Sequence, residues 1–465
     1  MSTTPTTVAV IGAGWAGCAA AVELTRAGHV VHLFEASRQL GGRARLMTRP
    51  TGNAASELSD SAWDAQLDNG QHILLGAYRH TLRLMRTVGV DLDASLLRLP
   101  LQMRYPAGSG GIDFQCPRLP APLHLLGALW RTTGMSRADK MSLLRFSSTA
   151  RWIDWRLNDD CTVSALLQCF EQTPRVTAML WRPLCMAALN TPPERASAQV
   201  FLNVLRDSLG ARRQASDMLL PRVDLSRLFP HAAASFVTAR GARIHLGRRV
   251  RAIVGSNRAW QLSIDAAPPP AHDLVGQPAT PQSFGAVIIA TPPTEANRLL
   301  ADCPRDLLDA HWQHEAITTC YLQYPPSVAL AAPFYALVDD AAAQCWGQFV
   351  FDRGQLDATQ RGLLAVVISA ALPQAAVDAS ALQQALAMQL AAAFANPTLQ
   401  HPLQGRVLTD KRATFSCVPG LVRPPVTTSR DGILRAGDYV AGEYPATLEA
   451  AVRSGIAAAA AVRVD

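Results

Sequence analysis

A glycine-rich turn close to the amino terminus constrains the fold of this chain more than any other feature of its sequence. The apolar run at residues 7–11 has the character of a strand, and a Gly-x-Gly-x-x-Gly motif follows it at positions 12–17. That motif opens a helical pattern over residues 16–27, and a second strand-like run covers residues 30–34. Strand, tight turn, helix and strand in this order predict the βαβ opening of a dinucleotide-binding fold.

Each glycine of the motif has its own expected role. Gly12 permits the tight turn, Gly14 lets the backbone approach a pyrophosphate, and Gly17 lets the helix pack closely on the sheet. The helix amino terminus then faces the phosphates. The candidate cofactor-binding residues of this turn also include Ala13, Trp15 and Ala16.

An acidic residue closes the second strand, as such a site requires. Glu35 lies 18 residues beyond Gly17, where its carboxylate can accept hydrogen bonds from both hydroxyls of an adenosine ribose. The same charge repels the 2′-phosphate of NADP. Glu35 and its neighbour Ala36 are therefore candidate cofactor contacts.

Composition bounds the size and the class of partner. A chain of 465 residues with 49% hydrophobic side chains predicts two closely joined domains. The formal charge is +7, but the arginines are dispersed, which argues against nucleic acid and favours an anionic membrane surface. Nine cysteines without a Cys-x-x-Cys pair indicate neither a metal site nor a disulfide framework.

The amino terminus predicts a cytosolic chain. The apolar run at residues 8–22 is shorter than the roughly 20 residues that cross a bilayer. The seven residues before it contain no Lys or Arg, so the basic region of a secretory signal is missing.

A second glycine pair begins six residues after Glu35. The segment Gly41-Gly42-Arg43-Ala44-Arg45 resembles the Gly-Gly-Arg segment of the FAD superfamily that includes monoamine oxidases, protoporphyrinogen oxidase and carotenoid desaturases. The resemblance implies FAD as cofactor, with Arg43 near its phosphates and the glycines allowing close backbone approach. The alternative for both arginines is a solvated basic turn. The candidate contacts are Gly41, Gly42, Arg43 and Ala44.

The carboxy-terminal residues 436–439 and 444–455 resemble the closing motif of the same superfamily. The resemblance implies that Asp438, after Gly437, holds the ribityl-phosphate region. It also implies that a helix beginning near Ala446 points its amino terminus at the pyrimidine edge of the flavin, where helix-dipole charge stabilises the anionic reduced form. Ala450 departs from the pattern, since many relatives carry Gly there. Thr447 and Leu448 complete the candidate contacts.

The expected fold class is α/β, with a discontinuous Rossmann-like FAD-binding domain and an inserted α+β substrate domain. Residues 249–253 resemble the strand that contacts adenine, with Val250 as the backbone contact, and residues 286–293 resemble the strand that returns to the active site. Residues 375–395 are nearly all helix formers. We expect the FAD domain at 1–75, 230–300 and 425–465, the substrate domain at 76–229 and 301–424, and surface loops around 53–60 and 266–282.

Residues 67–78 carry the most discriminating pattern, a Gly-x-His followed by Gly-Ala-Tyr. It resembles hydroxysqualene dehydroxylases and plant-type phytoene or zeta-carotene desaturases, which both act on long apolar isoprenoids. The Asp-Asn-Gly-Gln-His form favours the dehydroxylases, and residues 410–415 resemble a segment of that group. The resemblance implies reductive dehydroxylation of hydroxysqualene to squalene, in squalene and hopanoid biosynthesis. Candidate cofactor contacts here are Asn69, Gly70, Gln71 and His72.

His72 is the one candidate catalytic residue. It can donate to a leaving hydroxyl group or to a flavin carbonyl, and a purely structural role is the alternative. Gly70 and Gly76 can bring backbone against the flavin ring. Tyr78 is interpreted as a packed aromatic with its hydroxyl at the surface.

Three other functions stay open. A carotenoid desaturase would run the flavin in the opposite direction and form a coloured product. A flavin amine oxidase would use an aromatic cage around a cation. A non-enzymatic scaffold with a relict FAD domain would bind flavin weakly, and the intact motifs at both ends argue against it.

Residues 117–156 combine Leu and Trp with seven Arg or Lys residues. Such a stretch suits docking at the inner face of the cytoplasmic membrane, beside upstream squalene-pathway enzymes. A helix pair with a solvated basic face is the equal alternative.

Overall fold

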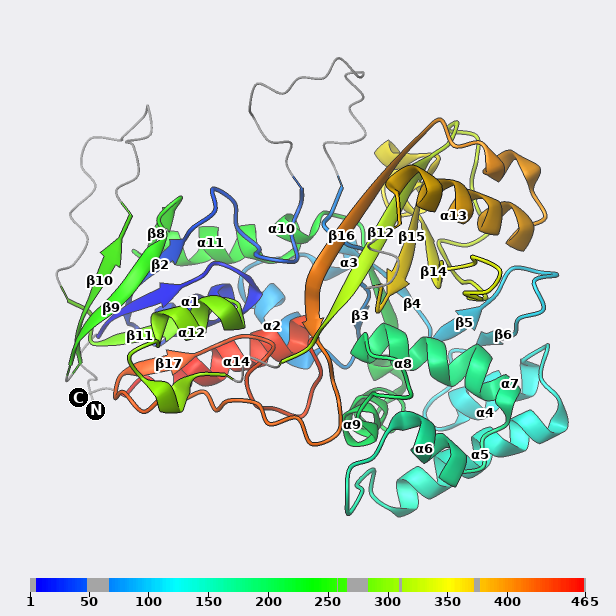
Figure 1. Ribbon diagram of the computed structural model, residues 1–465, viewed down its shortest axis with the longest axis horizontal. Coiled ribbons are helices and arrows are strands. Elements are labelled where there is room, and N and C mark those ends of the chain that lie inside the picture. Colours follow the sequence, from blue (N-terminus) through cyan, green and yellow to red (C-terminus); the bar gives the residue numbers. More distant parts are fainter. Residues whose placement is uncertain are drawn as a thin grey trace.

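The computed structural model describes residues 6–47, 67–256, 258–265, 283–308, 312–371 and 377–463. The loops predicted around 53–60 and 266–282 lie outside these residues. Three groups of elements are visible in Figure 1: a parallel sheet with its helices, an antiparallel sheet covered by a helix, and a cluster of helices.

The parallel sheet has the strand order β17-β11-β1-β2-β8. Its central strands are buried almost completely, as expected for a parallel sheet covered on both faces. The predicted strands at 7–11 and 30–34 are present, and the predicted helix at 16–27 is α1. The bounds are β1 Thr7–Ile11, β2 Val30–Glu35, β8 Arg243–Leu246, β11 Ala286–Ile289, β17 Ile433–Arg435 and α1 Trp15–Arg26.

Helix α1 packs against two other helices from distant parts of the chain, α11 (Pro230–Thr238) and α14 (Leu448–Ala460). Gly455 of α14 allows this approach, since a Cβ there would lie 2.2 Å from the carbonyl oxygen of Ala16. The parallel sheet and the helices that pack on it therefore form the α/β fold that the glycine motif predicts. Elements that border this core are β9 Val250–Ser256, β10 Ala259–Ile264, α10 Leu225–Leu228 and α12 Pro293–Leu299.

The antiparallel sheet has the order β13-β14-β15-β12-β16, and α13 lies on one face. Alternation along β14 separates its two faces: Val350 packs in the core under α13, whereas Phe349 and Phe351 point to the opposite side. Helix α13 falls within the helix-forming stretch at 375–395. The bounds are β12 His314–Gln323, β13 Phe334–Ala336, β14 Phe349–Asp352, β15 Leu363–Ser369, β16 Gln404–Phe415 and α13 Ala379–Ala393.

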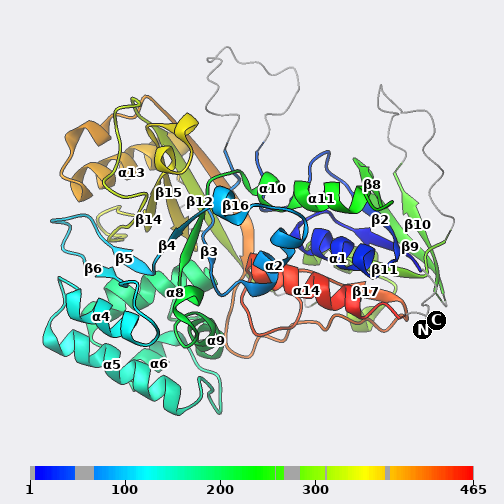
Figure 2. The same ribbon diagram turned by 180° about the vertical axis from the view of Figure 1, so that it is seen from behind.

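The helical cluster lies beyond the second face of that sheet, with α8 between the sheet and the remaining helices (Figures 1 and 2). A π-helical turn at Thr177–Trp181 runs directly into α8. Helix α5 begins with a capping box between Ser136 and Asp139. The bounds are α4 Leu123–Arg131, α5 Arg137–Trp152, α6 Val163–Cys169, α7 Pro174–Val176, α8 Arg182–Leu189 and α9 Ala198–Ser208.

Helix α2 follows the predicted domain boundary at 75/76 yet packs against α14. The buried carboxylate of Glu449 accepts hydrogen bonds from the backbone N–H groups of His80 and Thr81, so it caps α2 from a distant segment. The exact domain limits stay a prediction. Short elements in this region are α2 Arg79–Thr87, α3 Leu92–Ser95, β3 Leu74–Leu75, β4 Leu96–Leu99, β5 Gln102–Arg104, β6 Asp113–Gln115 and β7 Met218–Pro221.

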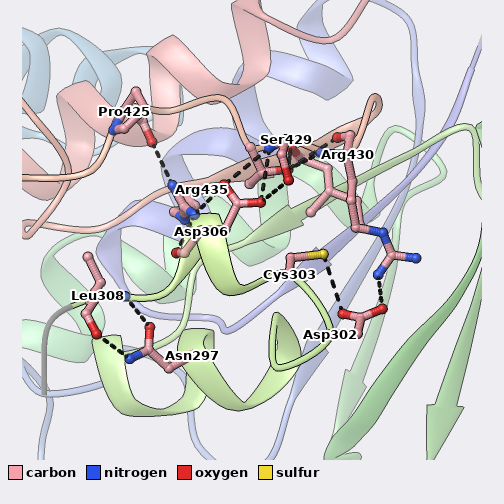
Figure 3. A network of polar contacts seen from close by, with 11 residues as sticks. Asn297, Asp302, Cys303, Asp306, Leu308, Pro425, Ser429, Arg430 and Arg435 are labelled. Carbon is pink, nitrogen blue, oxygen red and sulfur yellow. Dashed lines mark hydrogen bonds and ion pairs between the residues drawn. The ribbon is translucent and has the colours of Figure 1, made fainter.

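Figure 3 shows the polar network that anchors the carboxy-terminal strand. The guanidinium of Arg435 is buried and donates to the carbonyl oxygen of Asp306 at 2.6 Å and to its carboxylate at 3.0 Å. The same carboxylate accepts from the backbone N–H of Ser429. A buried ion pair with this many hydrogen bonds fixes geometry more than it adds stability. It holds the end of β17, from which the Gly437-Asp438 turn emerges.

Candidate active site

A cavity of about 450 Å³ opens where the parallel strands end. Residues at or just beyond the carboxyl ends of β1, β2, β11 and β17 line it, among them Gly12, Glu35, Thr291 and Gly437. Ligands bind at this edge of open α/β sheets because strand ends and helix amino termini converge there. The cavity continues past the sheet to α8 and the antiparallel sheet.

The three glycines of the amino-terminal turn differ in their surroundings. Gly12 has φ +105°, and a Cβ there would lie 2.6 Å from the carbonyl oxygen of Ala290. A Cβ on Gly17 would lie 1.8 Å from the carbonyl oxygen of Gly12, so this position needs glycine for packing. Gly14 meets only the Cα of Gly42, at 3.8 Å, and it lines the cavity. The turn therefore leaves an open backbone surface at Gly14.

Glu35 is held by the turn itself. Its carboxylate accepts hydrogen bonds from the backbone N–H groups of Ala13 and Ser37, both at 2.8 Å. A carboxylate offers about four lone-pair positions, so two remain for a ligand in the cavity. This arrangement suits two ribose hydroxyls. Ala13 supports Glu35 through this bond but does not line the cavity. Ala36, the residue after Glu35, lines it.

Arg43 connects the two ends of the sequence. Its guanidinium pairs with Asp438 at 2.6 Å and donates to the carbonyl oxygen of Ala413 at 2.6 Å. The neighbouring carboxylate of Asp438 raises the pKa of Arg43, against the opposing effect of burial. Both residues line the cavity, whereas Arg45 lies outside its wall.

The amino terminus of α14 also faces the cavity. Thr447 caps the helix by accepting a hydrogen bond from the backbone N–H of Ala450, and α14 begins at Leu448, two residues after the expected start. Burial raises the pKa of the Tyr78 hydroxyl, which lines the same part of the cavity and is not at the molecular surface. Ala446, Thr447 and Leu448 all line this wall.

His72 lies in the cavity wall as a neutral ring. Its Nδ1 is 2.9 Å from the carbonyl oxygen of Gly70, which can only accept, so Nδ1 carries the proton. Burial lowers the pKa of the ring. The free Nε2 can then accept a hydrogen bond but has no proton to donate, and this geometry disfavours the acid role.

Gln71 next to it is fixed at both ends of its amide. Its Nε2 donates to the hydroxyl of Tyr321 at 2.9 Å, and its Oε1 accepts from Arg353 at 3.1 Å. Tyr321 in turn donates to the carbonyl oxygen of Asp68, whose own carboxyl pKa burial raises to about 7. Backbone and side chain of residues 68–72 are thus held rigidly beside the cavity.

The far end of the cavity is apolar. Strands β12, β14 and β15, helix α8 and Ile73 supply its wall. The apolar side chains there are Ile73, Met186, Ile317, Phe349, Phe351 and Val367.

One polar group of three side chains interrupts the apolar end: Asn190, Ser369 and Thr414. Asn190 ends α8 with φ +48° and donates to the Thr414 hydroxyl at 2.9 Å, while its oxygen accepts from the backbone N–H of Ala370. Asn190 and Ser369 were not predicted from the sequence. The available signal for Asn190 was an Asn, able to adopt the left-handed conformation, at the end of a helical pattern before Thr-Pro-Pro.

The residues at the sheet end fit an FAD molecule. The buried hydroxyl of Thr291 has no hydrogen-bond partner among the described residues, and it faces the same cavity. An unpaired buried hydroxyl is costly, so a ligand contact accounts for it. Of the candidate cofactor contacts, Ala13 and Gly17 support the turn from behind and all the others line the cavity. Among residues that the structure describes, no three His, Cys, Asp or Glu side chains are grouped to hold a metal ion.

Comparison with known proteins gives a family and two kinds of relative. The family model of flavin containing amine oxidoreductases matches residues 15–463. Hydroxysqualene dehydroxylase of Rhodopseudomonas palustris is 29% identical, with 97% of each chain covered, and that of Sinorhizobium fredii is 27% identical, with 98% covered. A probable zeta-carotene desaturase of Synechococcus elongatus is 25% identical over 53% of this chain and 51% of its own.

Solved structures share the fold. A putative protoporphyrinogen oxidase from Exiguobacterium superposes with a TM-score of 0.65 at 16% identity, covering 99% of both chains. Wild-type putrescine oxidase bound to putrescine gives the same TM-score, identity and coverage. These similarities concern the arrangement of the elements.

Proposed function

The chain belongs to the flavin containing amine oxidoreductase family and is an FAD-dependent oxidoreductase, and on this premise we propose that it removes the hydroxyl group of hydroxysqualene to give squalene. The observation that carries the proposal is a cavity with dinucleotide motifs at one end and apolar side chains at the other. Full-length similarity to two hydroxysqualene dehydroxylases supports it, while the desaturase similarity covers about half of the chain.

We propose that the adenosine half of FAD lies at Glu35 and Val250 and the flavin half at the amino terminus of α14. The pyrophosphate joins these two halves of FAD, and Gly14 and Gly42 leave their backbone open to it. The positive end of the α14 dipole then stabilises negative charge on the flavin. Arg43 contributes to the shape of this site through its ion pair with Asp438, which joins the two walls of this part of the cavity.

Reduced FAD, when bound, supplies the hydride that replaces the departing hydroxyl group. The side chains of this protein provide the surroundings for that exchange. Departure of the hydroxyl group leaves an allylic cation, which water readily traps. Phe349, Phe351 and Val367 exclude water from this reacting carbon. Each methylene of the substrate buried among such side chains contributes about 0.8 kcal/mol to binding.

The departing oxygen needs a hydrogen-bond donor in this apolar end. Because Thr414 accepts from Asn190, its own hydroxyl proton is free to point toward another acceptor. We propose that Thr414 and Ser369 hold the oxygen as it leaves, and that His72 orients the site as a hydrogen-bond acceptor. Burial favours the neutral form of the His72 ring, and the bond to Gly70 places its proton on Nδ1, which is consistent with that role.

The same protein must obtain a substrate that dissolves in lipid. Helices α4 and α5 expose Trp130 by 87% and Trp152 by 86%, with Arg131, Arg137 and Lys140 on the same helices. Within the described residues, none of the helices has both the length and the apolar character to cross a bilayer. We propose that these two helices, here termed the α4–α5 surface, dock on an anionic leaflet at the inner face of the cytoplasmic membrane, near upstream squalene-pathway enzymes.

Anaerobic reaction of the reduced protein with hydroxysqualene tests the proposed activity, with identification of the extracted lipid. A carotenoid desaturase would instead form a coloured conjugated product from phytoene with the oxidised protein. An amine oxidase would consume oxygen with an amine.

A further inference from the structure

We propose that a second apolar cavity, between α4 and α5, binds the end of the substrate hydrocarbon that is remote from the reacting carbon. The inference rests on the proposed function and extends it to a second chamber for the same long chain. The cavity measures about 250 Å³. Its wall is formed mainly by leucines of α4 and α5, together with Met103, Phe114, Leu180 and Trp181.

The second cavity follows the first along one face of α8. Leu184 lines the second cavity, and Ala187 and Ala188 line the first. Residues three and four apart lie on the same side of a helix, about 4.5 to 6 Å along its axis. Figures 1 and 2 show α8 between the antiparallel sheet and the α4–α5 pair. A single extended chain that passes along this face reaches both chambers.

The chemistry of the wall selects a hydrocarbon. The indole N–H of Trp181 is already bonded to Gln172 at 2.9 Å, so its ring faces the cavity without a free donor. The Ser148 hydroxyl bonds to carbonyl oxygens of its own helix. Arg151 is exposed at the rim, where its charge stays in water. Gln102 and Ser147 are the other polar side chains of a wall that is mostly apolar, so a ligand that carried several polar groups into this chamber would lose most of their hydration without replacement.

The cavity also opens toward the α4–α5 surface. Leu126 lines it and is 47% exposed, and Trp130 lies one turn further along α4. Protein cores of this kind are packed with few voids larger than a water molecule. A chamber of this size that lies beside the same helix α8 as the substrate cavity and opens toward the docking surface is therefore suited to the tail of a chain drawn from lipid.

Trp181 provides a direct readout of binding. In flavin-loaded full-length protein, brominated squalene should quench part of the tryptophan fluorescence in a saturable manner, and Trp181→Phe should lose that part. Ser147→Phe, which adds a ring at the cavity wall, should abolish the same component, while Thr149→Phe on the same helix should retain it. Quenching by a phospholipid with brominated acyl chains, but not by brominated squalene, would overturn the proposal in favour of a lipid site. No quenching of Trp181 by either probe would overturn it outright.

Kinetics then test the link to the reaction. Ser147→Phe should raise KM for hydroxysqualene at least tenfold with kcat little changed, because the reacting carbon is held elsewhere. Thr149→Phe should stay within twofold of the unmodified protein. An unchanged KM in Ser147→Phe would contradict the proposal. If the protein proves inactive on hydroxysqualene, the proposed function fails, and the quenching experiment still decides whether the chamber binds an apolar chain.

Discussion

The guanidinium of Arg43 and the carboxylate of Asp438 lie 2.6 Å apart, although 395 positions separate them in the sequence. One follows the second strand of the amino-terminal βαβ unit, and the other follows the last strand of the sheet. The pair closes the cavity wall from both ends of the chain. Cofactor binding and the docking of the carboxy-terminal segment therefore depend on each other.

Replacing Asp438 by Asn tests this coupling. The change leaves Arg43 without its charged partner at a half-buried site, and we expect FAD affinity to fall about tenfold and stability to fall by about 1 kcal/mol. Flavin titration and thermal unfolding measure the two effects. Asp265→Asn is the control, because Asp265 pairs with Arg251 away from the cavity at an exposed site. Equal flavin affinity in both variants would show that the Arg43 pair has no role in the site.

Two glycine variants separate folding from cofactor binding. Gly17→Ala should destabilise the protein by several kcal/mol, because its Cβ would overlap the carbonyl oxygen of Gly12. Gly14→Ala meets no protein atom closer than 3.8 Å and should fold normally, yet it should lose FAD because the methyl group projects where the pyrophosphate is proposed. Circular dichroism and flavin content give the comparison. A Gly14→Ala protein with full flavin content would contradict the proposed pyrophosphate position.

The hydroxyl of Thr414 is proposed to hold the departing oxygen. Thr414→Val keeps the shape of the side chain and removes that donor, so kcat should fall about ten- to hundredfold with flavin content unchanged. Thr409→Val serves as control, since Thr409 lies on the same strand and bonds to Thr318. An unchanged kcat in Thr414→Val would contradict the role of Thr414 and leave Ser369 as the proposed donor.

A buried histidine pair makes stability depend on pH. Nδ1 of His32 lies 3.1 Å from Nε2 of His245, and burial, followed by the charges of His245 and Arg243, lowers the pKa of His32 to about 4. The unfolded chain has a His pKa near 6.5 and so binds more protons between about pH 6.5 and pH 4. Stability therefore falls as pH decreases through this window, by about 2 kcal/mol at pH 5.

His32→Phe should remove that contribution, and urea unfolding at pH 5 and pH 7.5 measures it. The loss of stability between the two pH values should be smaller in His32→Phe than in the unmodified protein. His401→Phe is the control, because His401 is exposed. An equal pH dependence in all three proteins would mean that the His32–His245 pair does not titrate as described.

Docking of the α4–α5 surface predicts a dependence on lipid charge and on its tryptophans. The protein should float with anionic vesicles and much less with neutral ones, and less again in high salt. Trp130→Ser with Trp152→Ser should weaken the association at least tenfold, while Val422→Ser, a change at an exposed apolar residue outside both helices, should not. Equal flotation of the double variant would support the alternative of a solvated basic face.

The local pattern of the sequence was sufficient to predict the βαβ unit at the sheet end of the cavity. The Gly-x-Gly-x-x-Gly turn and Glu35 act over short distances, so β1, α1 and β2 were predicted to within one residue. The residues of the apolar end could not be predicted in the same way from local sequence. Phe349, Asn190 and Thr414 come from three segments and meet only because β14, α8 and β16 pack together.

The same reason explains the connections that were not predicted from the sequence. The motif around Asp438 was identified, but its ion pair with Arg43 depends on the final order of the sheet. Glu449 likewise was part of a helix pattern, and its role as the cap of α2 follows from tertiary packing. Residue type and spacing predicted candidate groups, and the fold decides which of them meet.

The proposed dehydroxylation is best tested by an anaerobic reaction of dithionite-reduced, flavin-loaded protein with hydroxysqualene, followed by absorbance and lipid extraction. We expect reoxidation of the flavin together with squalene in an amount stoichiometric with the flavin. Flavin that stays reduced with no squalene formed, in protein whose oxidised form is bleached by phytoene, would contradict the dehydroxylase and identify a desaturase.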